Sequence, residues 1–250
     1  MTSVTEHYAT HLAPIYLWMA GGSVAALEAG SAEIDALNLP PTPGTLVIDL
    51  GAGFGMHAIP LARKGARVTA IDTSIELLRT LTDLGDGLAI RTVNDELLGF
   101  QRHISETPAA ILCMGDTITH LQDFQAVESL VEKASAELPP GGAFVVSFRD
   151  YTEPLVGDSR FIPVRSDDSR ILTCFLEYEP ESVLVHDILH QRTSDGWRTQ
   201  VSHYRKLRLS PEYLITKLQS SGFKVRREAG MRGMVRLVAT KSSPSDHATS

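Results

Sequence analysis

The 250-residue sequence is 43% hydrophobic and 21% charged, which is enough to bury one substantial core. The formal net charge is −7 with Lys and Arg scattered, so we expect no nucleic-acid partner. Cys113 and Cys174 form no Cys-x-x-Cys pair, and no apolar run reaches the about 18 residues of a membrane helix. These features predict a soluble cytoplasmic protein with no disulfide framework, no bound metal and no membrane contact.

The N-terminal part, residues 1–44, reads as a helical segment followed by a stiff linker. Aromatic and aliphatic side chains from Tyr8 to Met19 recur at helical spacing. Tyr8, Tyr16 and Trp18 are therefore candidates for closing over a pocket, although a simple core stripe fits the same spacing. The sequence NLPPTPG at 38–44 is typical of a semi-rigid connection.

The next part of the chain alternates strand and helix patterns. Short apolar, β-branched runs alternate with helical spacing, and glycine or proline follows most of them. A Thr73-x-x-Glu76 capping box is expected to begin the second helix of this region. Such alternation predicts right-handed crossovers and a mainly parallel sheet. The five expected strands are 45–50, 66–71, 88–93, 109–114 and 143–148.

The segment 159–209 breaks this alternation. Three strand patterns, 170–178, 183–191 and 198–207, are joined by turn residues without an intervening helix, which predicts an antiparallel cap inserted after strand five. The sequence leaves open whether the cap is a lid or a dimer interface, and so whether the protein is a monomer or a homodimer. A helix beginning at Ser210-Pro211 follows, and the two last strands, 223–227 and 234–240, predict an antiparallel hairpin at the sheet edge.

The expected fold is α/β, with a seven-stranded, mainly parallel sheet and helices on both faces. Four parts are predicted along the chain. They are an N-terminal helical segment and linker (1–44), a core (45–158 plus 210–241), a cap (159–209) and a flexible tail (242–250).

The turn after the first expected strand reads Asp49-Leu-Gly51-Ala52-Gly53-Phe-Gly55. Glycines at a strand tip let the backbone approach a ligand where a Cβ would interfere. The dinucleotide-binding motif Gly-x-Gly-x-x-Gly, if it began at Gly51, would place a glycine at position 56. This chain has Met56 there. The turn can instead face a methionine-type amino acid, whose ammonium favours the nearby Asp49.

A second acid, Asp72, stands at the tip of the second expected strand. There its carboxylate would accept both hydroxyls of a ribose. The pair of a glycine turn and a strand-tip acid therefore indicates a nucleoside site, although a tight turn and a helix-capping acid explain each feature separately.

The ordered motifs VIDLGAGFG, VTAID, MGDTITHL and LPPGGAFVVSFRDY resemble those of class I S-adenosylmethionine-dependent methyltransferases, whose core is Rossmann-like. More narrowly, Gly115 to Leu121 and Phe148 to Tyr151 are similar to stretches of the glycine N-methyltransferase-like small-molecule group. That group has a Gly-Asn-Ser-type loop and Arg-Asn-Tyr, where this chain has Gly115-Asp116-Thr117 and Arg149-Asp150-Tyr151. The resemblance covers roughly residues 45–151 and the closing helix and hairpin.

The resemblance implies the cofactor S-adenosylmethionine and a small-molecule methyl acceptor. Arg149 would hold an acceptor carboxylate, with Tyr151 beside it. The resemblance also implies cofactor contacts at the strand ends, from Asp49, Gly51, Ala52, Gly53, Asp72, Thr73, Asn94, Asp95, Met114, Gly115 and Asp116.

Methyl transfer mainly needs the acceptor held in line with the carbon–sulfur bond and water excluded. If a proton must leave first, His120 is the candidate base, although a structural histidine fits its position equally. N-methylation of an amine bearing a carboxylate is expected over O- or S-methylation. Two other functions remain open, a nicotinamide-dependent oxidoreductase of the same fold and a non-catalytic protein that binds the cofactor.

Overall fold

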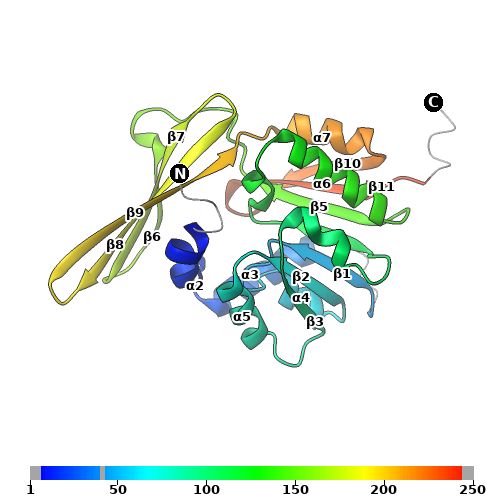
Figure 1. The fold of residues 1–250 in the computed structure, drawn as a ribbon, viewed down its shortest axis with the longest axis horizontal. Helices are drawn as coiled ribbons and strands as arrows, with labels where there is room; N and C mark the ends of the chain where they lie inside the picture. Colours follow the sequence, from blue (N-terminus) through cyan, green and yellow to red (C-terminus); the bar gives the residue numbers. More distant parts are fainter. Residues whose placement is uncertain (1–6, 40–42, 244–250) are drawn as a thin grey trace.

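The computed structural model describes residues 7–39 and 43–243 (Figure 1). Within these residues, seven strands form one sheet in the order β10-β11-β5-β4-β1-β2-β3. Strands β5, β4, β1, β2 and β3 are mutually parallel, while β11 runs antiparallel to both β5 and β10. The predicted α/β class, with its antiparallel hairpin at the sheet edge, is confirmed.

The strands of this sheet lie close to their predicted positions. Strand β1 is buried along its whole length, as expected for a central parallel strand covered on both faces. The bounds are β1 Leu46–Leu50, β2 Arg67–Asp72, β3 Ile90–Asn94, β4 Ala110–Cys113, β5 Ala143–Phe148, β10 Phe223–Ala229 and β11 Val235–Lys241.

Helices cover both faces of the sheet. One face packs on α6 (Phe124–Glu137) and α7 (Pro211–Ser220), through residues such as Leu130 and Leu214. The other face packs on α3 (Ser23–Leu37), α4 (Ala58–Arg63) and α5 (Ile75–Leu84). Figure 1 shows these two groups on opposite sides of the strands. The core therefore consists of two apolar layers separated by the sheet.

Two local predictions were wrong. The side chain of Ser74, not that of Thr73, caps α5, because its hydroxyl accepts from the backbone N–H of Leu77. Between β3 and β4 the chain forms only the short 3-10 segment η3 (Leu97–His103) and no full helix. Both differences are local, and the parallel pairing of β3 with β2 and of β4 with β1 is as expected.

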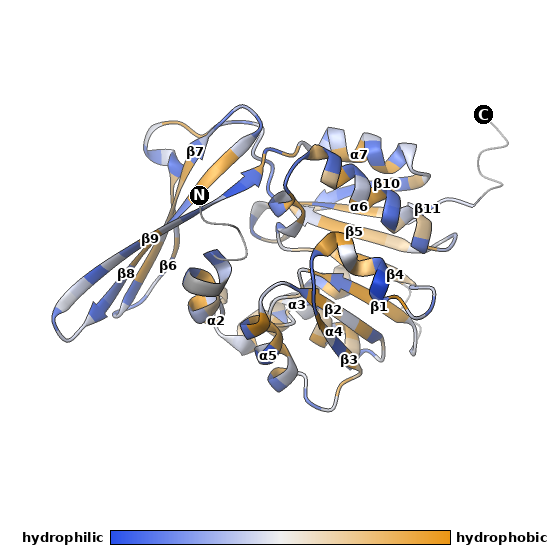
Figure 2. Cartoon of the chain, viewed as in Figure 1, coloured by the Kyte–Doolittle hydropathy of each residue, from blue (hydrophilic) through white to orange (hydrophobic). Residues whose placement is uncertain are grey.

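The cap is a separate antiparallel sheet. Within the described residues it has the four strands β6 (Phe161–Ser166), β7 (Arg170–Tyr178), β8 (Ser182–Thr193) and β9 (Gly196–Leu207), in that order. Strand β6 was missed by the sequence analysis, because its exposed polar and proline residues lack a strand pattern. Figure 2 shows that the end of the β8–β9 hairpin farthest from the core is mostly hydrophilic.

Arg208 joins the beginning and end of the cap excursion. The short 3-10 turn η5 (Gly157–Arg160) leads from the core into the cap. The chain returns to the core just beyond β9. The Arg208 guanidinium donates to the carbonyls of Tyr151 (3.0 Å), Thr152 (2.6 Å) and Glu179 (2.8 Å). The chain therefore leaves and re-enters the core at one place.

The N-terminal segment lies between the cap and the core (Figure 1). It comprises a π-helical turn η1 (Tyr8–Leu12), a 3-10 turn η2 (Ala13–Ile15), a short α2 (Tyr16–Ala20) and the long α3. Helix α3 crosses the glycine turn closely, since a Cβ at Gly30 would come within 1.9 Å of the Met56 carbonyl oxygen.

The predicted linker and the predicted tail lie partly outside the described residues, at positions 40–42 and 244–250. Among the residues that are described, no helix is both long enough and apolar enough to cross a bilayer.

Candidate functional site

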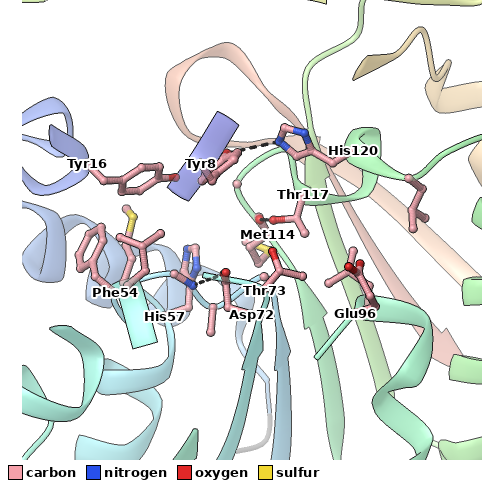
Figure 3. A pocket seen from close by; sticks show the side chains of 18 residues that line it. Tyr8, Tyr16, Phe54, His57, Asp72, Thr73, Glu96, Met114, Thr117 and His120 are labelled. Atoms are coloured by element: carbon pink, nitrogen blue, oxygen red, sulfur yellow. Dashed lines mark hydrogen bonds between the residues drawn. The ribbon is translucent and has the colours of Figure 1, made fainter. Parts of the chain in front are cut away.

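A pocket opens at the carboxyl ends of β1, β2 and β4, and its empty space is about 980 Å³ when the part open to solvent is included. This is where open α/β sheets place their ligands. Figure 3 shows Tyr8, Tyr16 and His120 on one side of it, facing Asp72 and Thr73 on the other. Ten of the residues singled out from the sequence line it: Tyr8, Tyr16, Gly51, Ala52, Gly53, Asp72, Thr73, Met114, Gly115 and His120.

The glycine turn forms the floor of the pocket. Gly51 has a φ of 72°, and a Cβ there would come within 2.4 Å of the Thr117 Cγ2 atom. Only glycine combines this backbone conformation with so close an approach of the two loops. The glycine at position 51 is therefore required by the packing of the site.

Asp72 joins the turn to the second strand. Its carboxylate accepts hydrogen bonds from the backbone N–H groups of Gly53 and Ser74, both at 2.8 Å. Burial raises the pKa of Asp72, and these N–H groups oppose that shift. The glycine turn and the strand-tip acid, predicted to be neighbours, are in direct contact.

Asp49 is almost fully buried below the turn, and its Oδ2 atom has no hydrogen-bond partner among the described residues. Burial raises its pKa to about 6, against the opposing effect of His57. His57 lines the pocket, and its Nε2 atom lies 3.0 Å from Glu33 of α3. An unpaired buried carboxylate oxygen is costly, but Asp49 is not among the residues that line the pocket, so it lies behind the turn rather than at the pocket surface.

The opposite end is aromatic. The Tyr8 hydroxyl lies 3.4 Å from His120 Nε2, and the two rings meet edge to face. His120 also stacks on Tyr204 at 5.4 Å, and its Nδ1 atom is buried without a partner among the described residues. Burial, with the nearby Lys206 cation, lowers the pKa of His120 to about 3. His120 is therefore neutral near pH 7.

Asn94 and Asp95 are placed beside the pocket but do not line it. The Asn94 amide donates to the carbonyls of Asp72 (3.0 Å) and Thr73 (2.9 Å), which holds the strand tips together. Asp95 bonds to Arg102 and His103, which keep its pKa well below the usual range. The next two residues, Glu96 and Leu97, line the pocket instead.

Asp116 and Tyr151 belong to a buried polar cluster next to the pocket. Asp116 forms an ion pair with Lys206 and accepts from the Tyr151 hydroxyl (3.1 Å) and the Arg149 backbone N–H (2.9 Å). Burial alone would raise the pKa of Asp116, but Lys206 and these donors lower it overall. Both residues therefore hold the loop after β4 in place rather than line the pocket.

Trp18 and Arg149 point elsewhere. Trp18 donates to Asp167 at 2.5 Å and packs against Arg170 of the cap. The Arg149 side chain donates to the Arg232 carbonyl at 3.0 Å. Neither is among the residues that line the pocket.

Eight lining residues were not predicted from the sequence, and most of them are apolar or adjacent to predicted positions. Their only sequence signal was proximity to the motifs. They are Phe54, Met56, His57, Leu77, Glu96, Leu97, Thr117 and Leu121.

Residues 47–142 match a protein family described as a methyltransferase domain. A ubiquinone biosynthesis O-methyltransferase of Xylella fastidiosa is 36% identical over 112 residues, 43% of each chain. A glycine/sarcosine N-methyltransferase of Aphanothece halophytica is 28% identical over 107 residues, 42% of this chain and 40% of that protein. The matched region thus spans about two fifths of these curated relatives.

Solved structures resemble nearly the whole chain. An S-adenosylmethionine-dependent methyltransferase from Clostridium acetobutylicum has a TM-score of 0.75 at 14% identity, covering 92% of this chain and 99% of that one. The CcbJ methyltransferase from Streptomyces caelestis has a TM-score of 0.75 at 20% identity, covering 94% and 98%. At these identities the likeness is one of fold. Residues 47–142 thus match a methyltransferase domain, and the chain as a whole shares its fold with solved S-adenosylmethionine-dependent methyltransferases.

Proposed function

We propose that this chain is an S-adenosylmethionine-dependent methyltransferase that methylates a small-molecule amine. The observation that carries the proposal is the contact between Gly53 and Asp72 at the floor of an open pocket. The match to a methyltransferase domain over the same strands supports it. The core, 45–158 plus 210–241, would bind the cofactor, and the cap (159–209) and the N-terminal part (1–44) would close the acceptor end.

The residues present fit the cofactor. A Cβ at Gly51 would collide with Thr117, another lining residue, so the turn needs a bare backbone there. Asp49, whose buried oxygen has no partner among the described residues, would act on an ammonium group from behind the turn, since it does not line the pocket. Asp72 and Thr73 would hold the ribose, Gly51 to Gly53 would offer backbone contact, and Met114 and Gly115 would lie beside the methionine part. Asn94, Asp95 and Asp116 would act through their neighbours, since none of them lines the pocket.

The bound cofactor supplies an activated methyl group, so the chain's own residues need only position the acceptor. A neutral His120 lines the proposed acceptor end, where its Nε2 atom lies within hydrogen-bond distance of the Tyr8 hydroxyl. A histidine with a pKa of about 3 is a weak base near pH 7, which favours an uncharged amine over a hydroxyl that must first lose a proton. The relatives named above include both N- and O-methyltransferases.

Arg149 could hold an acceptor carboxylate, as predicted from the sequence, only if its side chain moved. Its guanidinium would have to leave the Arg232 carbonyl and turn towards the pocket. Within the described residues, no Lys or Arg side chain lines the pocket. We therefore propose an amine acceptor whose recognition depends mainly on aromatic contacts.

Calorimetry with S-adenosylhomocysteine and NADH tests the cofactor. Binding of S-adenosylhomocysteine alone is expected, while binding of NADH alone would establish the oxidoreductase alternative. Transfer of a radiolabelled methyl group to a panel of small amines, phenols and thiols then tests the reaction. Labelled amines support the proposal, and tight cofactor binding without transfer to any of the three acceptor classes would favour the non-catalytic alternative.

A further inference from the structure

Two consecutive residues at the start of the described chain serve different parts of the molecule. His7 is fully buried against the cap, whereas Tyr8 lines the pocket. Because they share a peptide bond, the placement of one restricts the other. The contacts of His7 therefore bear on where the Tyr8 hydroxyl lies.

Both ring nitrogens of His7 are held by the cap. Nε2 lies 2.9 Å from the Asp187 carboxylate of β8, and Nδ1 lies 2.6 Å from the Ser202 hydroxyl of β9. Asp187 is only 2% exposed, and its other oxygen accepts from the Cys174 thiol at 2.8 Å. Two bonds from opposite sides fix the plane of the imidazole as well as its position.

The Tyr204 ring connects this buried group to the pocket. His7 packs on Tyr204 at 4.3 Å between ring centroids, and His120 stacks on the same residue at 5.4 Å. Tyr8 in turn reaches His120 with its hydroxyl. The four side chains form a closed set of contacts that links the cap, the N-terminal segment and the loop after β4.

The backbone here has little intrinsic stability to hold this geometry. Residues 8–15 form one π-helical and one 3-10 turn, which are short and weakly stabilised by local bonds. Tertiary contacts must therefore place Tyr8. Among the described residues, the His11 side chain also bonds to the backbone of Asp187 in the cap, while the bond from Trp18 to Asp167 is exposed and lies away from the pocket.

We propose that His7, Asp187 and Ser202 form a latch that fixes the N-terminal segment on the cap and so positions Tyr8 at the acceptor end. These three are positioning residues, since none of them lines the pocket. The inference rests on the proposed function for its catalytic meaning. The structural link from His7 to His120 stands on its own and can be tested without any acceptor.

His7→Phe tests the latch, because phenylalanine keeps a ring to pack on Tyr204 and removes both hydrogen bonds. His186→Phe is the matched control. His186 lies on β8 beside Asp187 and pairs with Glu177 at 3.1 Å, but its partly exposed side chain faces away from the N-terminal segment. Ser202→Ala removes a single latch bond and serves as the milder variant if His7→Phe does not fold.

The first readout is the nitrogen NMR signal of the His120 imidazole in histidine-labelled protein. Tyr8→Phe calibrates the signal shift that follows loss of the Tyr8–His120 bond. His7→Phe or Ser202→Ala is expected to shift it in the same direction, although neither residue touches His120. Hydrogen exchange of residues 8–19 should rise in the same variants and remain unchanged in His186→Phe. An unmoved His120 signal together with unchanged exchange would overturn the latch.

The second readout separates the latch from the proposed function. S-adenosylhomocysteine affinity should match wild type in His7→Phe, Ser202→Ala and His186→Phe, because the glycine turn is untouched and none of these residues lines the pocket. With an amine identified by the acceptor panel, kcat should fall on the order of 10- to 100-fold in His7→Phe through misplacement of the acceptor. Unchanged kcat would overturn the positioning role. Failure of wild-type protein to bind S-adenosylhomocysteine would instead overturn the proposed function, while the NMR and exchange results would still decide the latch.

Discussion

The two ends of the pocket are built in different ways. At the proposed cofactor end, Gly53 and Asp72 are 19 positions apart, and the backbone N–H of Gly53 in the turn donates directly to the Asp72 carboxylate at the end of β2. At the proposed acceptor end, Tyr8 and His120 are 112 positions apart, and His7 and Asp187 are 180 apart. The first end depends on local loop chemistry, and the second depends on how three distant segments pack.

The two ends also differ in electrostatics. The proposed cofactor end presents carboxylates, whereas the proposed acceptor end presents tyrosines and a neutral histidine. This difference explains why a positively charged nucleoside and an uncharged acceptor could share one pocket. It also means that single substitutions should affect one end without the other.

The largest effect is expected for Gly51→Ala. The new Cβ would overlap Thr117 and occupy a left-handed backbone conformation, so S-adenosylhomocysteine affinity should fall on the order of 100-fold or more. Gly87→Ala is the control, since Gly87 has a similar φ of 76° with nothing within 4 Å. Equal affinities of the two variants in calorimetry would remove Gly51 from the cofactor end.

The raised pKa of Asp49 predicts that the free energy of unfolding depends on pH. Its folded pKa of about 6 exceeds the unfolded value of about 3.9, so its contribution to stability is complete below pH 4 and is lost as pH rises through 6. The free energy of unfolding, relative to Asp49→Asn, should fall by up to about 3 kcal/mol between pH 4 and pH 7. Denaturant unfolding at several pH values measures this. Saturating S-adenosylhomocysteine should shrink the decline, and a decline of equal size would contradict pairing with the ligand ammonium.

Asp72→Ala should weaken S-adenosylhomocysteine binding by about 1–3 kcal/mol through loss of charged hydrogen bonds. The backbone N–H of Gly53 would also lose its acceptor. Asp83→Ala, an exposed carboxylate on α5, controls for the change in net charge. Calorimetry that shows the same affinity for both variants would place the ribose elsewhere.

Arg149→Met should have the smallest effect. Loss of the bond to the Arg232 carbonyl is expected to cost about 0.5–1.5 kcal/mol of folding free energy, with the acceptor KM unchanged. Thermal unfolding and steady-state kinetics measure the two quantities. A raised KM confined to carboxylate-bearing acceptors would restore Arg149 to the acceptor end.

The cofactor end was largely predictable from the sequence. A buried strand, a glycine turn and an acid at the next strand tip all lie within residues 45–73, and their contact follows from parallel strand pairing. The sheet, its edge hairpin and the existence of the cap were predicted for the same reason, because each depends on local pattern.

The acceptor end was only partly predictable. Tyr8, Tyr16 and His120 were identified as candidates, but Trp18 and Arg149 turned away because Asp167 and the Arg232 carbonyl bind them. His7, Asp187 and Tyr204 carried no motif at all. Their roles come from the packing of the cap on the N-terminal segment. The spacing of apolar residues in the sequence does not predict such packing.

The bonds of Arg208 to Tyr151 and Thr152 have a consequence for how such a protein can change over time. The cap begins and ends at the same place on the core. A shorter hairpin, or one from another protein, would therefore need only a short connection there, and the strand order of the core would stay the same. Such an exchange would replace Tyr204, which stacks on His120, while the glycine turn and Asp72 would be left unaltered.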